Sequence, residues 1–296
     1  MLANASNLLK SLTLILIFVQ INSTIGAEEE CGLLDPTFYA LSKNVAHINE
    51  FPWVGRIAYK SETDPKNTTY YACIAVLISK SHMLSRARCF IDKTLMPNLV
   101  ILGDWDIANS VTKRDCMHKN SSCNEVPQQY SIMEVALHPR FQNRTGNNDI
   151  VVLTLATEVN ITEFVRPICL PPEEWSPNDH LAQYLRYVGY QNSKKNSKML
   201  KTMGMVISMR TCQNNMGGWL PYINDTNICL SRAQSHNLIS GSPVMGVTIK
   251  DGEPHNYYLI GLLDSKILAY ISYYDIFIRV APYLDFIKTN MNKSCD

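Results

Sequence analysis

The sequence has no marked excess of either charge, no internal repeat and no low-complexity linker. Lys and Arg number 27 and Asp and Glu number 26, so the chain gives no reason to expect binding to nucleic acid or to an anionic membrane surface. No apolar run reaches the ~20 residues that a membrane-spanning helix needs. These absences, with a length of 296 residues, predict one large domain or two fused half-domains and no membrane span.

The N-terminus has the features of a secretory signal. Lys10 provides a positive charge, residues 12–19 are apolar, and Ala27 is a small residue suited to cleavage. We therefore predict a signal peptide over residues 1–27, a mature chain that begins near Glu28, and secretion to the extracellular space.

Cysteines and glycosylation motifs agree with secretion. Nine cysteines in an exported chain predict disulfides. Six Asn-x-Ser/Thr tripeptides lie in the mature part, and together they indicate a glycosylated extracellular surface. The predicted acceptors are Asn67, Asn120, Asn143, Asn160, Asn224 and Asn292.

Short apolar or alternating runs recur along the mature chain, and this pattern is typical of all-β barrels or sandwiches. Residues 281–291 differ, because apolar residues such as Tyr283 and Ile287 repeat there at helical spacing. We therefore predict an all-β fold that ends in an α-helix. The expected strands include residues 71–78, 98–102, 149–155, 184–190, 241–248, 257–263 and 276–280.

Several motifs carry a resemblance to a known family. They are residues 49–53, Cys73 and Cys89 around a strand pair, residues 146–153, residues 165–171, residues 240–243, and residues 277–280 before the C-terminal helix. Their order and spacing resemble the chymotrypsin-like serine proteases (the trypsin family) over nearly all of the mature chain. The resemblance implies two six-stranded antiparallel β-barrels packed together, with a site between them.

The resemblance also implies domain boundaries. A short segment at residues 28–39, tethered by Cys31, would precede a protease homology domain at residues 40–291. The barrels would lie at about 50–160 and about 178–280, and residues 292–296 would form a tail.

The implied disulfides are Cys31–Cys169, Cys73–Cys89, Cys116–Cys123 and Cys212–Cys229. The short loop closed by Cys116 and Cys123, and the preceding residues 102–106, are similar to arthropod proteases of the clotting and melanisation type. Cys295 is left over, as a free thiol, a bridge to another chain or part of a disordered tail.

Amide hydrolysis in this family needs a nucleophilic serine, a histidine base and an aspartate that orients the histidine. Ser240 and Asp149 stand at two of these positions, but Arg88 stands just before Cys89, where the histidine belongs. A guanidinium with a pKa above about 12 stays protonated and cannot accept the serine proton. We expect no functional catalytic residue, and an Arg88–Asp149 ion pair in the old site. The histidines that could replace the base are His82, His138 and His236, and none is expected to do so.

The nucleophile motif and the activation switch are altered together. The family's Gly-Asp-Ser-Gly-Gly-Pro corresponds to residues 238–243, where Leu238 and Ile239 replace the glycine and the aspartate. That glycine donates an N–H to the oxyanion, and the aspartate binds the new N-terminus after activation cleavage. The cleavage site itself aligns with Tyr39 and Ala40, so both halves of the switch are missing.

The specificity pocket is expected to be degenerate. Gln234 takes the place of the aspartate at the base of a trypsin-like pocket, and Asp264 begins the segment that would pair with substrate backbone. Asp275 replaces a glycine of the pocket wall. Glycine is scarce, at 13 of 296 residues, which agrees with the loss of special loops.

The sequence therefore predicts a secreted, catalytically inactive serine protease homologue, of an arthropod non-catalytic type, that acts by protein–protein binding. Its expected role is cofactor or regulator of an extracellular proteolytic cascade, immune (melanisation) or reproductive, with proteases or prophenoloxidase as partners. No nucleic acid, membrane span or cofactor is expected, and Cys295 could form an intermolecular disulfide. The alternative is an active trypsin-like endopeptidase with non-standard catalytic residues. No metal is expected: Asp104 and Asp106 could bind calcium as in some relatives, but solvated turn carboxylates are the favoured interpretation.

Overall fold

The computed structural model describes residues 30–41, 43–61, 69–92, 95–118, 121–191, 196–217, 223–232, 237–269 and 272–293. The predicted signal peptide, Asn67, Asn120, Gln234, His236 and Cys295 lie outside these residues. Asn143, Asn160, Asn224 and Asn292, the acceptor asparagines inside them, are all exposed. No helix in the described part is long and apolar enough to cross a membrane.

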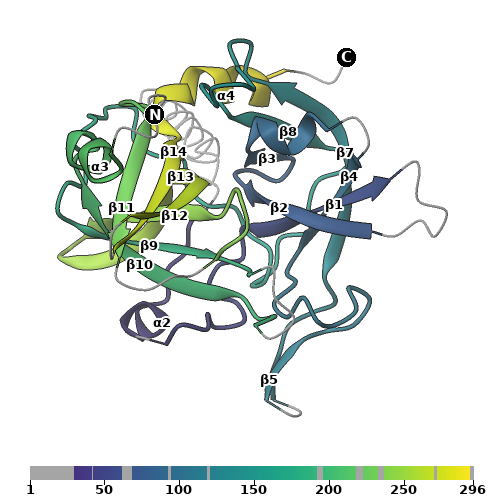
Figure 1. Cartoon of the computed structure of the whole chain (residues 1–296). Helices are drawn as coiled ribbons and strands as arrows, with labels where there is room; N and C mark the ends of the chain where they lie inside the picture. The colour runs from purple at the N-terminus through teal and green to yellow at the C-terminus, as the bar shows by residue number, and fades with distance from the viewer. Residues whose placement is uncertain are drawn as a thin grey trace, which may run out of the picture. The chain divides into compact units, whose positions relative to one another are not determined.

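The first six-stranded barrel comes from the N-terminal half of the chain and is drawn in purple to teal in Figure 1. All its strand pairs are antiparallel, and it closes in the order β1-β2-β3-β8-β7-β4. Closure leaves no strand with a free edge. Its strands are β1 (Val54–Ser61), β2 (Thr69–Leu77), β3 (His82–Ser85), β4 (Leu95–Leu102), β7 (Gln128–Leu137) and β8 (Val151–Leu155).

The second barrel closes in the order β10-β11-β14-β13-β12-β9, again through antiparallel pairs. Large apolar side chains fill it, among them the fully buried Tyr187, Leu230 and Phe277. Its strands are β9 (Tyr184–Gly189), β10 (Leu200–Ile207), β11 (Asn227–Arg232), β12 (Pro243–Lys250), β13 (Glu253–Ala269) and β14 (Ser272–Arg279). The predicted double-barrel fold is confirmed.

Short helices and one hairpin complete the structure. The predicted C-terminal helix is present, beginning with a 3-10 turn before α4. Ser208 caps the N-terminus of α3 (Met209–Asn215), because its hydroxyl accepts a hydrogen bond from the Thr211 N–H. The elements are α2 (Pro36–Ala40), η1 (Ala87–Phe90), β5 (Cys116–His118), β6 (Ser121–Cys123), α3 (Met209–Asn215), η2 (Ala281–Tyr283) and α4 (Leu284–Met291).

Among the described residues four disulfides form, in the pairs that the family resemblance implies: Cys31–Cys169, Cys73–Cys89, Cys116–Cys123 and Cys212–Cys229. Cys73 lies on β2 and Cys89 on η1, so one bridge fixes the segment that leads out of β3. The Cys31–Cys169 bridge ties the N-terminal segment to the connection between the barrels. The Cys73–Cys89 bridge therefore holds a segment that borders the site described below.

The buried His82 and His138 and the partly buried His180 predict a loss of stability in acid. Burial lowers the pKa of His82, His138 and His180 below the ordinary 6.5. Below pH 6.5 the unfolded chain therefore binds protons that the native chain does not, and the free energy of unfolding falls as the pH falls. Urea midpoints at pH 7.5 and 5.5 should show this decrease. The His138→Gln variant should show a smaller one, and an equal decrease in both proteins would contradict the assignment to His138.

Candidate active site

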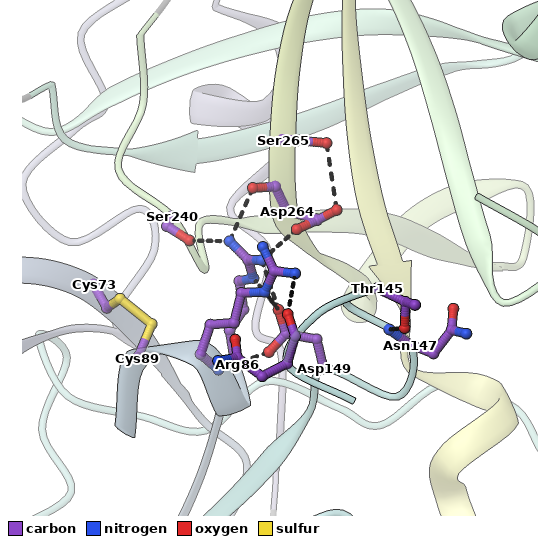
Figure 2. A network of polar contacts seen from close by, with 11 residues as sticks. Cys73, Arg86, Cys89, Thr145, Asn147, Asp149, Ser240, Asp264 and Ser265 are labelled. Atoms are coloured by element: carbon purple, nitrogen blue, oxygen red, sulfur yellow. Dashed lines mark hydrogen bonds and ion pairs between the residues drawn. A yellow bond between two sulfur atoms is a disulfide. The ribbon is translucent and has the colours of Figure 1, made fainter. Parts of the chain in front are cut away.

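Four polar side chains meet where the end of β3 in the first barrel faces two segments of the second (Figure 2). Arg86 lies between β3 and η1, and Asp149 lies just before β8. Ser240 belongs to the loop that precedes β12, and Asp264 lies on β13. Elements from both barrels therefore build the site.

Backbone contacts fix the Ser240 loop against β2. The Ile74 N–H donates to the Ser240 carbonyl at 2.8 Å, and the Ser85 hydroxyl donates to the Ile74 carbonyl at 2.7 Å. Gly241 follows with a φ of +85°, and a Cβ there would lie 2.4 Å from the Ile74 oxygen. Only glycine fits this approach and this conformation. The retained Gly241 therefore keeps Ser240 beside the end of β3.

Arg86 occupies the centre of the site. Its Nη1 donates to Ser240 Oγ at 2.5 Å, and its Nε and Nη2 donate to Asp149 Oδ2 at 3.1 and 2.6 Å. Nη2 also pairs with Asp264 Oδ1, and Nη1 donates to the Asp264 backbone oxygen at 2.9 Å. The side chain of Arg86 is 7% exposed, and that of Asp149 is fully buried. A buried guanidinium thus connects two carboxylates and the serine hydroxyl.

Arg88 contributes to the site through its backbone more than through its side chain. Its N–H donates to Asp149 Oδ1 at 2.7 Å, whereas its Nε stays 3.6 Å from Asp149 Oδ2. The side chain is 40% exposed, and its Nη2 donates to the Asn143 carbonyl at 2.7 Å. The expected Arg88–Asp149 ion pair is therefore present, but it is the longer of two pairs, and Arg86 rather than Arg88 fills the centre of the site. The η1 turn places the Arg88 side chain over residues 143–146, and Arg86 points inward instead.

Sequence reasoning missed Arg86 because it located the histidine position by spacing from Cys89. Every residue of β3 is buried, so that strand has no polar–apolar alternation that would indicate the direction of the next side chain. The available signal was an arginine directly after a wholly buried strand. A cation at such a place needs a carboxylate partner.

The Ser240 hydroxyl thus has a permanent cation as its hydrogen-bond donor. A guanidinium cannot take up the serine proton at neutral pH. Two of the three candidate histidines bond elsewhere: His82 Nδ1 is 2.9 Å from Ser79 Oγ, and His138 Nδ1 accepts from a backbone N–H at 3.2 Å. His236 lies outside the described residues.

The residues before Ser240 pack as core. Leu238 is fully buried and Ile239 is 8% exposed, and the Ile239 N–H donates to the Tyr190 carbonyl at 2.8 Å. The Leu238 carbonyl accepts from Lys266 Nζ at 2.5 Å. A hollow of about 230 Å³ opens beside these residues, bordered by Ser240 and Lys266.

Asp264 and Asp275, the described residues of the expected specificity pocket, bind different partners. Asp264 belongs to the Arg86 network. Asp275, on β14, is buried and accepts bonds from the Tyr187 hydroxyl at 2.5 Å and from Arg232. Burial, together with the neighbouring Asp275 carboxylate, raises the pKa of the Tyr187 hydroxyl, so the phenol stays protonated and donates. Asp275 therefore has an arginine and a tyrosine as partners inside the second barrel.

The segment aligned with the family's activation site is held in place. Arg186 Nη2 donates to the Tyr39 carbonyl at 2.9 Å, and Lys201 Nζ donates to the Phe38 carbonyl at 3.0 Å. Lys201 also pairs with the buried Glu50 at 2.6 Å. The C-terminal carbonyls of α2 are thus bound by two cations from the second barrel.

A metal site is not evident in the part of the chain that the structure describes, since no three His, Cys, Asp or Glu side chains gather suitably there. The two carboxylates considered as calcium ligands have other partners, and the expectation that both are solvated is wrong for Asp104, which is buried. Asp104 pairs with Arg56, and Asp106 Oδ1 accepts from the Ala108 N–H at 3.2 Å. Burial raises the pKa of Asp104, which makes its side chain a poorer cation ligand.

Two closed six-stranded barrels, with Asp149 from the first and Ser240 from the second between them, define a chymotrypsin-like protein. The sequence model of the trypsin family matches residues 41–287, and the chain belongs to that family. The predicted resemblance is confirmed.

Similar proteins are insect serine proteases and their relatives. Phenoloxidase-activating factor 3 of Holotrichia diomphalia is 28% identical, over 92% of this chain and 78% of that protein. CLIP domain-containing serine protease HP8 of Bombyx mori is 24% identical, over 92% of this chain and 74% of that protein. A crystal structure of the Drosophila Grass clip serine protease of the Toll pathway matches with a TM-score of 0.73 and 17% identity. It covers 90% of this chain and 76% of that one, and it supports the fold.

Proposed function

We propose that this chain is a secreted, non-catalytic member of the trypsin family that binds other proteins of an extracellular insect protease cascade. The coarse part of this function, a trypsin-like protein related to cascade proteases, follows from the family match and the relatives. Proteases of such a cascade, or prophenoloxidase, are the partners that the relatives' names suggest. That the protein is secreted, and that it lacks catalytic activity, are the parts that we propose beyond these matches.

The position of Arg86 carries the proposal. Its guanidinium contacts both Asp149 Oδ2 and Ser240 Oγ, which are the two atoms that a triad imidazole would have to bridge. Arg86 Nη1 also donates a hydrogen bond to the Asp264 backbone carbonyl, on the strand aligned with the family's substrate-pairing segment. The same residue therefore removes the space for a general base and covers a backbone acceptor.

The activation segment supports the same function. An active family member is cut before a new N-terminus that pairs with an aspartate near the nucleophile. Here that aspartate position is the buried Ile239, and the cut would fall inside α2, whose carbonyls are bound by Arg186 and Lys201. We propose that the chain works without cleavage, as a fixed binding surface.

A labelled fluorophosphonate tests the loss of catalysis. The secreted protein should label at Ser240 at least roughly 10³-fold more slowly than trypsin, because nothing accepts the serine proton. Mass spectrometry of the labelled peptide locates the site, and the Ser240→Ala variant gives the background. Stoichiometric labelling that disappears in Ser240→Ala would instead establish an active endopeptidase with non-standard residues.

A further inference from the structure

The opening of the site has more cations than carboxylates. Arg88 Nε lies 3.6 Å from Asp149 Oδ2, but Arg86 already binds the same oxygen. Asp149 and Asp264 are both paired with Arg86. Arg88 from the first barrel and Lys266 from the second remain exposed beside this network. The contacts of the Lys266 ammonium are with neutral oxygens, Asn237 Oδ1 at 2.6 Å and the Leu238 carbonyl at 2.5 Å.

Hydrogen-bond donors converge on the hollow of about 230 Å³ beside Ser240. Ser240 Oγ accepts from Arg86, so the serine's own O–H remains available to donate. An ammonium has three N–H groups, and its contacts with Asn237 and Leu238 use two of them, which leaves the third among the described residues. The described residues that line the hollow include no carboxylate.

We propose that this hollow binds the carboxylate side chain of an acidic segment of a partner protein. The inference rests on the proposed non-catalytic function and names the chemistry of the partner at the same site. A carboxylate there would accept from the Ser240 hydroxyl and the Lys266 ammonium, with charge-assisted hydrogen bonds. A second acidic residue of the same segment would meet Arg88 across the site, so the segment would contact both barrels.

The size and charge of the hollow select this ligand. About 230 Å³ is below the 300–1,000 Å³ usual for drug-sized ligands, and it suits one side chain. A basic side chain would face Lys266 and the Arg86 guanidinium, and like charges disfavour each other at such distances. The preference is therefore the opposite of that of a trypsin-like pocket with aspartate at its base.

Two short peptides test the proposal. The probe is fluorescein-labelled Gly-Glu-Gly-Glu-Gly amide, and the reference is the same peptide with Gln for Glu. Anisotropy at low ionic strength should show at least roughly tenfold tighter binding of the Glu peptide, because bonds to a charged group are the stronger ones. Lys266→Met should remove this preference, Lys266→Arg should keep it, and Ser240→Ala should weaken it several-fold. Lys250→Met, an exposed lysine on β12, is the matched control and should change nothing.

Equal binding of the two peptides would overturn the proposal, as would an unchanged preference in Lys266→Met. Loss of the preference in a folded Lys266→Arg variant would also overturn it, because charge would then not be the determinant. Circular dichroism verifies the fold of each variant. Mass spectrometry of the recovered Glu peptide separates the two proposals, since cleavage contradicts the non-catalytic function and leaves the binding measurement readable.

Discussion

Replacing Arg86 with methionine is expected to lower the free energy of unfolding by about 3–5 kcal/mol. The variant keeps an apolar side chain of similar length but removes the cation that bonds Asp149 Oδ2 through Nε and Nη2. Asp149 is fully buried, and a buried carboxylate that loses its main counter-charge is strongly destabilised. Urea unfolding at pH 7.5, followed by tryptophan fluorescence with the disulfides intact, measures the loss.

Arg88→Met is the matched control, because it removes the same charge two residues away. The Arg88 side chain is 40% exposed and its Nε is 3.6 Å from Asp149, so we expect a loss below about 1 kcal/mol. The backbone bond from the Arg88 N–H to Asp149 survives the substitution. A larger loss for Arg88→Met than for Arg86→Met would show that Arg88 is the central cation and that Arg86 is peripheral.

Much of the fold could be predicted because the relevant signals are local. β2, β8 and β14 are continuous or alternating apolar runs, and the cysteine spacing matched the family framework. β7 and β10 are less evident, because no residue of β7 is buried and the polar Lys201 and Thr202 interrupt the apolar residues of β10. Lys201 on β10, for example, is buried only because Glu50 lies opposite it. The partner of a buried charge is a long-range contact, and the local sequence does not contain it.

The candidate site also depends on long-range contacts that the local sequence does not contain. Spacing from Cys89 identified Arg88, whose backbone N–H donates to Asp149 Oδ1. The direction of its side chain depends on a separate loop, where a Cβ at Gly146 would lie 3.1 Å from Arg88 Nη2. Gly146 leaves the room that lets Arg88 turn outward, and Arg86 takes the interior. Two arginines separated by one alanine cannot be distinguished without that loop.

Replacing Arg56 with methionine is the second change expected to cost about 3–5 kcal/mol in the free energy of unfolding. Arg56 on β1 pairs with Asp104, and their side chains are 4% and 3% exposed. The Arg56 guanidinium also lies 4.1 Å from the centre of the Tyr71 ring. The Tyr190 hydroxyl, from the second barrel, donates to the Asp104 carbonyl, so the pair lies at a contact between the barrels.

The pH dependence of this loss identifies its cause. Burial already raises the pKa of Asp104, and the charge of Arg56 opposes that rise. Without Arg56 the carboxyl should protonate at a higher pH, so the destabilisation should be greatest at neutral pH and should shrink towards pH 4. Urea midpoints of the variant and the parent protein at pH 7.5, 5.5 and 4 measure this convergence.

The double variant Arg56→Met/Asp104→Leu should recover more than half of the loss, because an apolar pair of similar volume avoids the isolated buried charge. Recovery would show that the penalty of Arg56→Met comes from the Asp104 carboxylate and not from lost packing on Tyr71. Additive losses in the double variant, or a single-variant loss that does not change with pH, would contradict this explanation. Lost packing would then be the dominant effect, since packing against a neutral ring does not titrate.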